Sequence, residues 1–204
     1  HFLRAESHYV RLRYAYQLVR LAHYAGEYAQ AEELWDFLLP KVDRRKPSLI
    51  YYWTLSHLAG AQLKMGKKVD AAYHYMQVFL HCPSMRLTAA HSFRIDTDEQ
   101  WQAVYNRCWN DAERAALFAM RATQRNSKAV VDMEQIYRLQ PQSEFLEVLL
   151  VREIRKLERE LLGVQFDAER KSSRQLFTIP REEAGSYTID LQRFARVVNK
   201  NGNA

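Results

Sequence analysis

The stretch Gly26-Glu27-Tyr28-Ala29-Gln30-Ala31, followed by Trp35, recurs as Gly66-Lys67-Lys68-Val69-Asp70-Ala71, followed by Tyr75. The glycine, the second alanine and the aromatic residue each return at the same interval (26 to 66, 31 to 71 and 35 to 75). A repeat of about this length is typical of stacked helical hairpins, in which each unit buries its apolar face against a neighbour. The pattern therefore predicts a scaffold rather than an enzyme.

The composition indicates a folded, helix-rich chain. Of 204 residues, 48% are hydrophobic, and there are only six glycines and five prolines. Charges interrupt every apolar run before the roughly 18 residues that a membrane span needs, so we expect none. Two cysteines, Cys82 and Cys108, are too few for a disulfide framework. The first residue is His1 and not Met, so we expect a piece of a longer chain, and the sequence specifies no compartment.

The net charge of +6 is unevenly distributed. Residues 1–83 carry 11 Lys or Arg and 7 Asp or Glu, whereas residues 84–162 carry 12 of each kind. Charge that merely keeps the protein soluble is one explanation of this distribution. The excess in the first repeats otherwise indicates an acidic partner.

Two helical hairpins are expected in the first half of the chain. In the first, residues 2–42, one long helix over 2–25 ends at Gly26, and a return helix covers 28–42. The second, residues 49–82, follows Pro47, turns at Gly66 and stops at Pro83. Residues 84–96 suit either a short helix or an insertion lying across the array.

A third hairpin, residues 98–140, is expected to begin at a capping box formed by Thr97 and Gln100. Its first helix covers 98–124, and its return helix, 128–139, ends before Pro141. A further amphipathic helix is predicted over 144–162, which completes an all-α repeat domain at residues 1–162. Residues 163–204 have linker-like composition and are expected to form an extended tail with a short helix at 190–198.

The spacing resembles that of the tetratricopeptide repeat family, W-x2-L-G-x2-Y, then A-x3-F, then P. The second hairpin matches best, with Ala71, Tyr75 and Pro83 in the right order. The first hairpin has Asp43 in place of the proline, and the third, with Ala129, lacks the turn glycine. The resemblance implies antiparallel hairpins stacked as a short solenoid, and it covers residues 12–83 well.

In this family the inner faces of the first helices line a groove that holds a peptide or a partner helix. If Ala15 and Val19 face the packing side together with Leu18, residues two positions along lie opposite, because two residues turn the helix by about 200°. The candidate groove residues are therefore Arg13, Tyr16, Arg20, His23, Tyr24, Trp53, Ser56, Lys64, Arg114, Phe118 and Arg121. This face is basic and aromatic, so we expect capture of an acidic or C-terminal peptide. The Lys/Asn carboxylate clamp of chaperone-binding members is not matched.

Three alternatives remain open at this stage. The tail segments 177–180 or 187–191 could occupy the groove themselves. Residues 9–14 and the connector Arg44-Arg45-Lys46 could bind RNA or single-stranded DNA through phosphate contacts and base stacking. The array could also be a self-assembly module of a larger parent protein.

The sequence has no motif typical of catalysis, cofactor binding or metal binding, so we expect none of these functions. His74 and His81 lie two turns apart, too far for two ligands on one helix, and no H-E-x-x-H or paired C-x2-C motif accompanies them. No glycine-rich phosphate loop is present either. Cys108 has no positioned base beside it in the sequence, so a packing role is the better interpretation.

Overall fold

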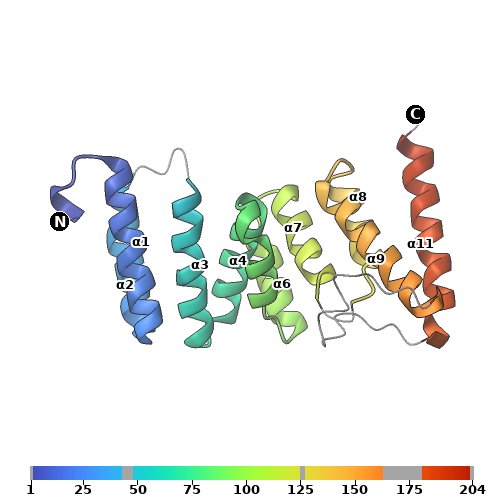
Figure 1. Ribbon diagram of the computed structural model, residues 1–204, viewed down its shortest axis with the longest axis horizontal. Coiled ribbons are helices and arrows are strands. Elements are labelled where there is room, and N and C mark those ends of the chain that lie inside the picture. Colours follow the sequence, from blue (N-terminus) through green and yellow to red (C-terminus); the bar gives the residue numbers. More distant parts are fainter. Residues whose placement is uncertain (1, 43–47, 125–126, 163–180, 203–204) are drawn as a thin grey trace. The chain divides into compact units, whose positions relative to one another are not determined.

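A computed structural model of the chain describes residues 2–42, 48–124, 127–162 and 181–202. The regular structure in these ranges is helical, which confirms the all-α class (Figure 1). The chain divides into two compact units, residues 1–113 and 114–204. The boundary between the units falls inside the helix Asp111–Ala122. The boundary predicted from the sequence was at residue 162, between the repeat domain and the tail.

The first unit begins with two antiparallel helix pairs. Its helices are α1 (His8–Ala25), α2 (Tyr28–Leu38), α3 (Leu49–Lys64) and α4 (Lys68–His81). Helix α1 packs against α2, and α3 packs against α4; α3 also contacts both α1 and α2 (Figure 1). The two repeated sequence stretches therefore form adjacent hairpins.

The two repeated glycines form the turns of these hairpins. Gly26 and Gly66 have φ angles of 81° and 80°, in the left-handed region that favours glycine. The N–H groups of Glu27 and Lys67, one residue later, donate to the carbonyl oxygens of Ala22 and Gln62. These bonds satisfy carbonyl groups at the helix ends, as in a Schellman cap.

Small residues lie where the helices of each hairpin meet. Ala31 and Ala71 are fully buried, and the aromatic rings of Trp35 and Tyr75 are buried beside them. The buried Gln62 of α3 joins three helices, because its amide donates to Glu32 of α2 at 3.0 Å and its oxygen lies 2.7 Å from Nδ1 of His74 in α4.

The first helix is shorter than the sequence predicted. Residues Phe2–Arg4 form a single 3-10 turn, η1, and α1 begins only at His8 after the extended Ser7. The Arg11 side chain stabilises this break, since its Nε donates to the carbonyl oxygen of Ala5 at 2.6 Å. Helix α2 ends at Leu38, and the 3-10 turn η2 (Leu39–Lys41) contains Pro40, which has no N–H to continue the helix.

After α4 come the 3-10 turn η3 (Pro83–Met85), the short helix α5 (Arg86–Ser92) and α6 (Asp98–Arg107). The Thr97 hydroxyl accepts from the Gln100 N–H at 3.3 Å, as the capping box predicted. The Gln100 side chain reaches back to the N–H of Asp96, one residue before the expected one.

The predicted helix 98–124 is two helices. Helix α6 ends at Arg107 because Cys108 is extended, with ψ 124°. A second cap follows: Asn110 accepts from the Glu113 N–H, and the Glu113 carboxylate accepts from the Trp109 N–H, both at 2.9 Å. This reciprocal cap starts the helix α7 (Asp111–Ala122).

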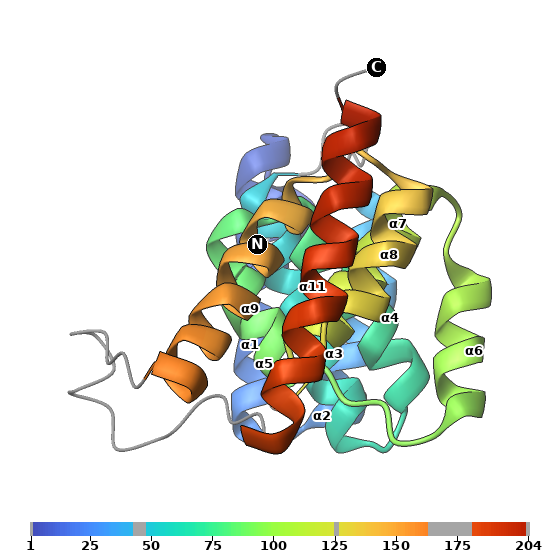
Figure 2. The ribbon, with the colours of Figure 1, turned by 90° about the vertical axis from the view of Figure 1, so that its right-hand side faces the viewer.

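The second unit contains most of α7, together with α8 (Val130–Leu139), α9 (Glu144–Leu162) and α11 (Arg181–Gly202). Helix α9 packs against α8 and α11, and α11 also contacts α8 (Figure 2).

The predicted linker and short helix beyond residue 180 are therefore wrong for 181–202, which form one long helix. Ala184, Tyr187, Leu191 and Phe194 are buried at helical spacing along it. Glu182 and Glu183 in its first turn favour a helix start. The basic connector at residues 44–46 and the tail segment at 177–180 lie outside the described residues.

Candidate functional site

Helices α1 and α3 carry positive charge without any negative charge. Neither helix contains an aspartate or a glutamate, while together they contain Arg11, Arg13, Arg20 and Lys64. The acidic residues of the two hairpin helix pairs lie on the return helices, at Glu32, Glu33 and Asp36 of α2 and Asp70 of α4. The two hairpins thus separate charge by helix, and α1 packs directly on α3.

The predicted groove residues of α1 and α3 differ in exposure. Arg13, Tyr24 and Lys64 are exposed, and Tyr16, Arg20, His23 and Trp53 are half-buried. Ser56 is buried and offers no surface to a partner. Leu18, expected on the packing side with Ala15 and Val19, is 39% exposed, so that part of the prediction is wrong.

Two histidines join the helices at the centre of this face. The Nδ1 atoms of His23 on α1 and His57 on α3 lie 3.1 Å apart. Tyr24 stacks on His23 and meets the edge of His57, with ring centroids 5.6 and 5.4 Å apart. Gly60 allows this approach, because a Cβ there would lie 2.7 Å from Cε1 of His23.

Both histidines are held neutral. Burial, with smaller contributions from the nearby His23 and Arg20, lowers the pKa of His57 to about 4. Burial also lowers the pKa of His23, with a contribution from the positive charge of Lys64. Arg20 and Lys64 therefore act on the centre of the face from opposite helices.

Aromatic rings hold the cationic side chains in place. The guanidinium groups of Arg13 and Arg20 lie 5.0 and 5.1 Å from the ring centroids of Tyr9 and Tyr24. Between the helices, Tyr16 packs on Trp53 with ring centroids 6.0 Å apart. We call the surface formed by Arg13, Tyr16, Arg20, Tyr24, Trp53, His57 and Lys64 the α1/α3 face.

His57 is the member of this face that sequence reasoning missed. It follows Trp53 by four residues and precedes Lys64 by seven, which places the three on one side of α3. That spacing could have found it. The predicted groove residue was Ser56, one position earlier, which lies about 100° around the helix from His57 and is buried.

One polar atom of the α1/α3 face has no hydrogen-bond partner. The indole Nε1 of Trp53 is buried and has no acceptor among the residues that the structure describes. A buried donor left unpaired costs about 1–3 kcal/mol. An acceptor brought by a ligand would remove this cost.

The three predicted groove residues of the second unit lie in a different setting. Phe118 is buried, and the guanidinium group of Arg121 lies 5.2 Å from its ring centroid. Arg121 also binds Asp132 of α8 with two hydrogen bonds, of 3.0 and 2.6 Å, from Nε and Nη2. Arg114 is half-buried. In contrast to the arginines of the α1/α3 face, Arg121 meets a carboxylate of its own unit.

A buried polar network connects the helices of the second unit. Glu153 of α9 is fully buried, and its carboxylate accepts from Lys156 Nζ at 2.7 Å and from the Tyr187 hydroxyl of α11 at 2.6 Å. Lys156 also donates to the Ser127 carbonyl oxygen at 2.6 Å. Burial lowers the pKa of Lys156, and burial together with the bond to Glu153 raises that of Tyr187.

Arg152 extends the network to the end of α7. Its Nη2 donates to the carbonyl oxygens of Thr123 and Gln124, at 3.1 and 3.0 Å. Its Nη1 also donates to the carbonyl oxygen of Ala122, in the last turn of α7, where the negative end of the helix dipole lies. The network has partners throughout and fastens α9 to its neighbours, so it is structural.

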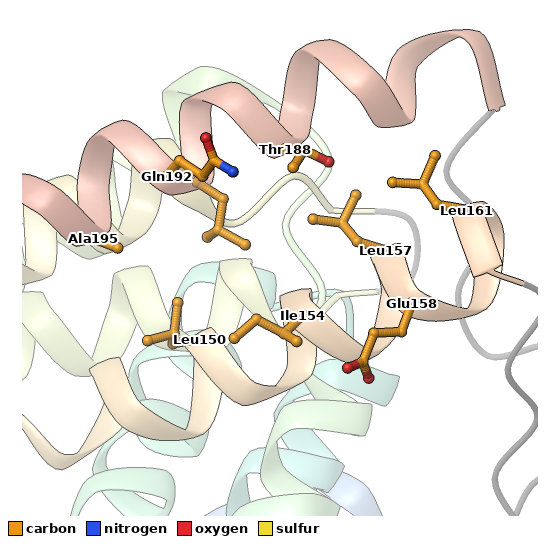
Figure 3. Close-up of a pocket in the computed structure, with 9 residues that line it drawn as sticks. Leu150, Ile154, Leu157, Glu158, Leu161, Thr188, Gln192 and Ala195 are labelled. Atoms are coloured by element: carbon orange, nitrogen blue, oxygen red, sulfur yellow. The ribbon is translucent and has the colours of Figure 1, made fainter.

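An apolar groove of about 370 Å³ lies between α9 and α11 (Figure 3). Its apolar lining comes from Leu150, Ile154, Leu157 and Leu161 of α9 and from Leu191 and Ala195 of α11. Its polar lining residues are Glu158, Thr188 and Gln192. The groove can hold an apolar side chain, and it has no cluster of groups for acid–base chemistry.

Neither a metal site nor a reactive thiol is apparent in the described parts of the chain. No three His, Cys, Asp or Glu residues there are close enough to hold a metal ion. Cys82 and Cys108 are both buried. No described helix has the length and apolar character needed to cross a membrane.

Comparison of the chain with protein-family models, curated proteins and solved structures gives no significant match.

Proposed function

We propose that this chain is a non-catalytic protein-interaction scaffold with stacked hairpins like those of tetratricopeptide repeats, and that its α1/α3 face binds an acidic peptide segment. One observation carries the proposal. Two adjacent helices without a single carboxylate present Arg13 and Arg20 beside tyrosine rings, and Lys64 near His23.

The hairpin geometry supports the repeat assignment. Glycines with positive φ form both turns, and the fully buried Ala31 and Ala71 lie where the paired helices pack closely. The first helices of the two hairpins, α1 and α3, contact each other directly. In tetratricopeptide repeats such helices line the binding surface, and we therefore propose the α1/α3 face as the corresponding surface of this chain.

The chemistry of the face suits carboxylates. Arginine binds a carboxylate through two parallel hydrogen bonds, and aromatic and Arg residues are common hot spots of interfaces. His23 and His57 are neutral, so a bound acid would interact chiefly with Arg13, Arg20 and Lys64. The unpaired indole N–H of Trp53 would gain an acceptor from a peptide if Tyr16 moved aside.

The test is a titration with a fluorescent peptide of alternating Glu and Ala and with the same peptide carrying Gln in place of Glu. We expect binding of the Glu peptide that weakens with salt, and much weaker binding of the Gln peptide. The variant Arg13→Glu with Arg20→Glu should lose binding by at least about tenfold.

The matched control is Arg193→Glu with Arg196→Glu on the exposed side of α11, which changes the net charge equally. Equal loss in both variants would mean that only net charge matters and would contradict a binding face. Binding of a single-stranded oligonucleotide in preference to the Glu peptide would favour the nucleic-acid alternative. Tyr16 packs on both Trp53 and His57, whereas Tyr9 and Tyr24 are 50% and 68% exposed and would be the rings on which bases stack in that case.

A further inference from the structure

The outward side of α9 carries a short stripe with apolar residues in the middle and opposite charges at its ends. Val148 and Val151 are 63% and 44% exposed, far more than the buried Leu149 on the other side of the helix. Glu144 lies four residues before Val148, and Arg155 lies four residues after Val151. Spacings of four, three and four keep these residues on one side of the helix.

The stripe is held in a fixed orientation by the opposite side of α9. There, Phe145, Leu149 and Leu157 are buried, and Glu153 and Lys156 belong to the buried network. Because that network binds the last residue of α7, the α7–α8 connection and α11, α9 cannot rotate to bury the valines within its own unit. The two exposed valines therefore form a small apolar contact area on a helix of fixed orientation, which a partner with a matching stripe can cover.

We propose that two copies of this chain associate through α9, packed against α9 of the second copy in antiparallel orientation. In this arrangement Val148 packs on Val151 of the second copy, and Val151 packs on Val148 of the second copy. The same register places Glu144 opposite Arg155 of the second copy, and the two-fold axis generates this pair twice.

The charge order of the stripe selects both the orientation and the occupant. A parallel pair would place like charges together, Glu144 beside Glu144 and Arg155 beside Arg155, which is unfavourable. A stripe that is complementary to itself only in the antiparallel sense is what a two-fold symmetric interface requires. Both charged residues also have interactions within their own chain, so the second copy adds to existing interactions.

The contact is small. A helix of 19 residues is about 28 Å long, and a pair of such helices buries less than the roughly 800 Å² per partner of a typical stable interface. We therefore expect a weak dimer whose population rises with protein concentration. This association is independent of peptide binding at the α1/α3 face.

Sedimentation of the full chain over a concentration series tests the association. Glu144→Arg and Arg155→Glu should each weaken it by about tenfold or more, because each leaves like charges opposite one another. Mixing the two variants should restore association, since each introduced charge then faces the opposite introduced charge on the other chain, while the unchanged Glu144 and Arg155 also meet. Circular dichroism identifies any variant that fails to fold. In that case the mixing experiment is repeated with Glu144→Lys and Arg155→Asp, which reverse the same charges.

Disulfide trapping tests the register. Val148→Cys mixed with Val151→Cys should cross-link faster than Val131→Cys, which is equally exposed on α8, at 62%. The native Cys82 and Cys108 are buried and give little background. A chain that stays monomeric at every concentration overturns the proposal. So does a dimer that neither responds to these charges nor traps the 148–151 pair.

Discussion

The imidazole Nδ1 atoms of His23 and His57 lie 3.1 Å apart, and this contact joins the first helices of two successive hairpins. It forms because Gly60 has no side chain and because both rings are neutral, so that one nitrogen donates and the other accepts. The contact between the two helices therefore depends on the charge of the rings, because protonation of both would place two positive charges side by side, next to Arg20 and Lys64.

Acid should therefore destabilise the first unit. The pKa of His57 is about 4 in the folded protein against 6.5 for an unperturbed histidine, and the pKa of His23 is lowered as well. The unfolded chain then binds protons first, so stability is complete above about pH 6.5 and declines as the pH falls toward about 4. We expect a lower urea midpoint at about pH 5 than at about pH 7.5, and a smaller difference for His57→Gln.

His74, whose pKa burial also lowers to about 4, accounts for part of the dependence that remains in this variant. A wild-type urea midpoint that stays constant or rises on acidification would contradict the assignment of neutral histidines. The comparison must be made at constant ionic strength, because Arg20 and Lys64 contribute through charge.

Gly60→Ala should destabilise the wild-type protein and stabilise a protein that lacks the His23 ring. The added Cβ would lie 2.7 and 2.9 Å from Cε1 and Nε2 of His23, which overpacks the contact. We expect a net loss of about 1 kcal/mol, since overpacking costs about 1–3 kcal/mol and the alanine gains up to about 1 kcal/mol of helix propensity. In His23→Ala the two shortest contacts are removed, the 3.3 Å contact with the Tyr75 hydroxyl is the closest that remains, and we expect the propensity gain of about 1 kcal/mol to outweigh it. The same sign in both backgrounds, measured by urea unfolding, would contradict the close approach.

Glu153→Gln should be among the most damaging substitutions in the second unit. It leaves the charge of Lys156 buried without its carboxylate, which costs about 3–5 kcal/mol. Glu153→Gln combined with Lys156→Met removes both charges and should lose less stability than the single change. Tyr187→Phe removes one hydrogen bond to Glu153 and should cost about 1–3 kcal/mol. Thermal unfolding of these variants gives the order, and a double variant no more stable than Glu153→Gln would count against a coupled pair.

Ala71→Trp should lower stability by about 1–3 kcal/mol, because the alanine is buried where α4 meets α3. Ala29→Trp on the exposed side of α2 is the matched control and should leave unfolding nearly unchanged. Equal melting temperatures for the two variants would argue against close packing in the second hairpin and against the repeat assignment that depends on it.

The sequence predicted the first two hairpins because their signals are local. Gly26 and Gly66 are expected at these turns because the turn requires a positive φ angle, which glycine adopts readily. The spacing of the alanine and aromatic residues follows from the close packing of the paired helices. The break at Cys108 was missed because Asn110 and Glu113 form a cap within a segment that also suits one continuous helix. Helix α11 was missed because Pro180, Gly185 and nearby polar residues look like a linker, although Ala184, Tyr187 and Leu191 have helical spacing.

The candidate site was predictable in composition more than in contacts. The charged and aromatic residues of α1 and α3 can be listed from the sequence alone. Of the residues that the helical offset selected, Arg13, Tyr24 and Lys64 are exposed, and their role in binding stays a prediction. The meeting of His23 with His57 depends on the angle and distance at which α1 crosses α3, which Gly60 permits but sequence spacing does not specify. For the same reason the pairing of Arg121 with Asp132 could not be read from either helix alone.

Photo-cross-linking would map where an acidic peptide binds. A Glu-rich peptide with a photoreactive group in its centre is irradiated with the full chain, and the labelled residues are identified by mass spectrometry. We predict labels on α1 and α3, near Tyr16, Tyr24 and Trp53, that disappear in Arg13→Glu with Arg20→Glu and persist in Arg193→Glu with Arg196→Glu. Labels concentrated on α9 or α11, or spread evenly over the surface, would contradict a binding face on α1 and α3.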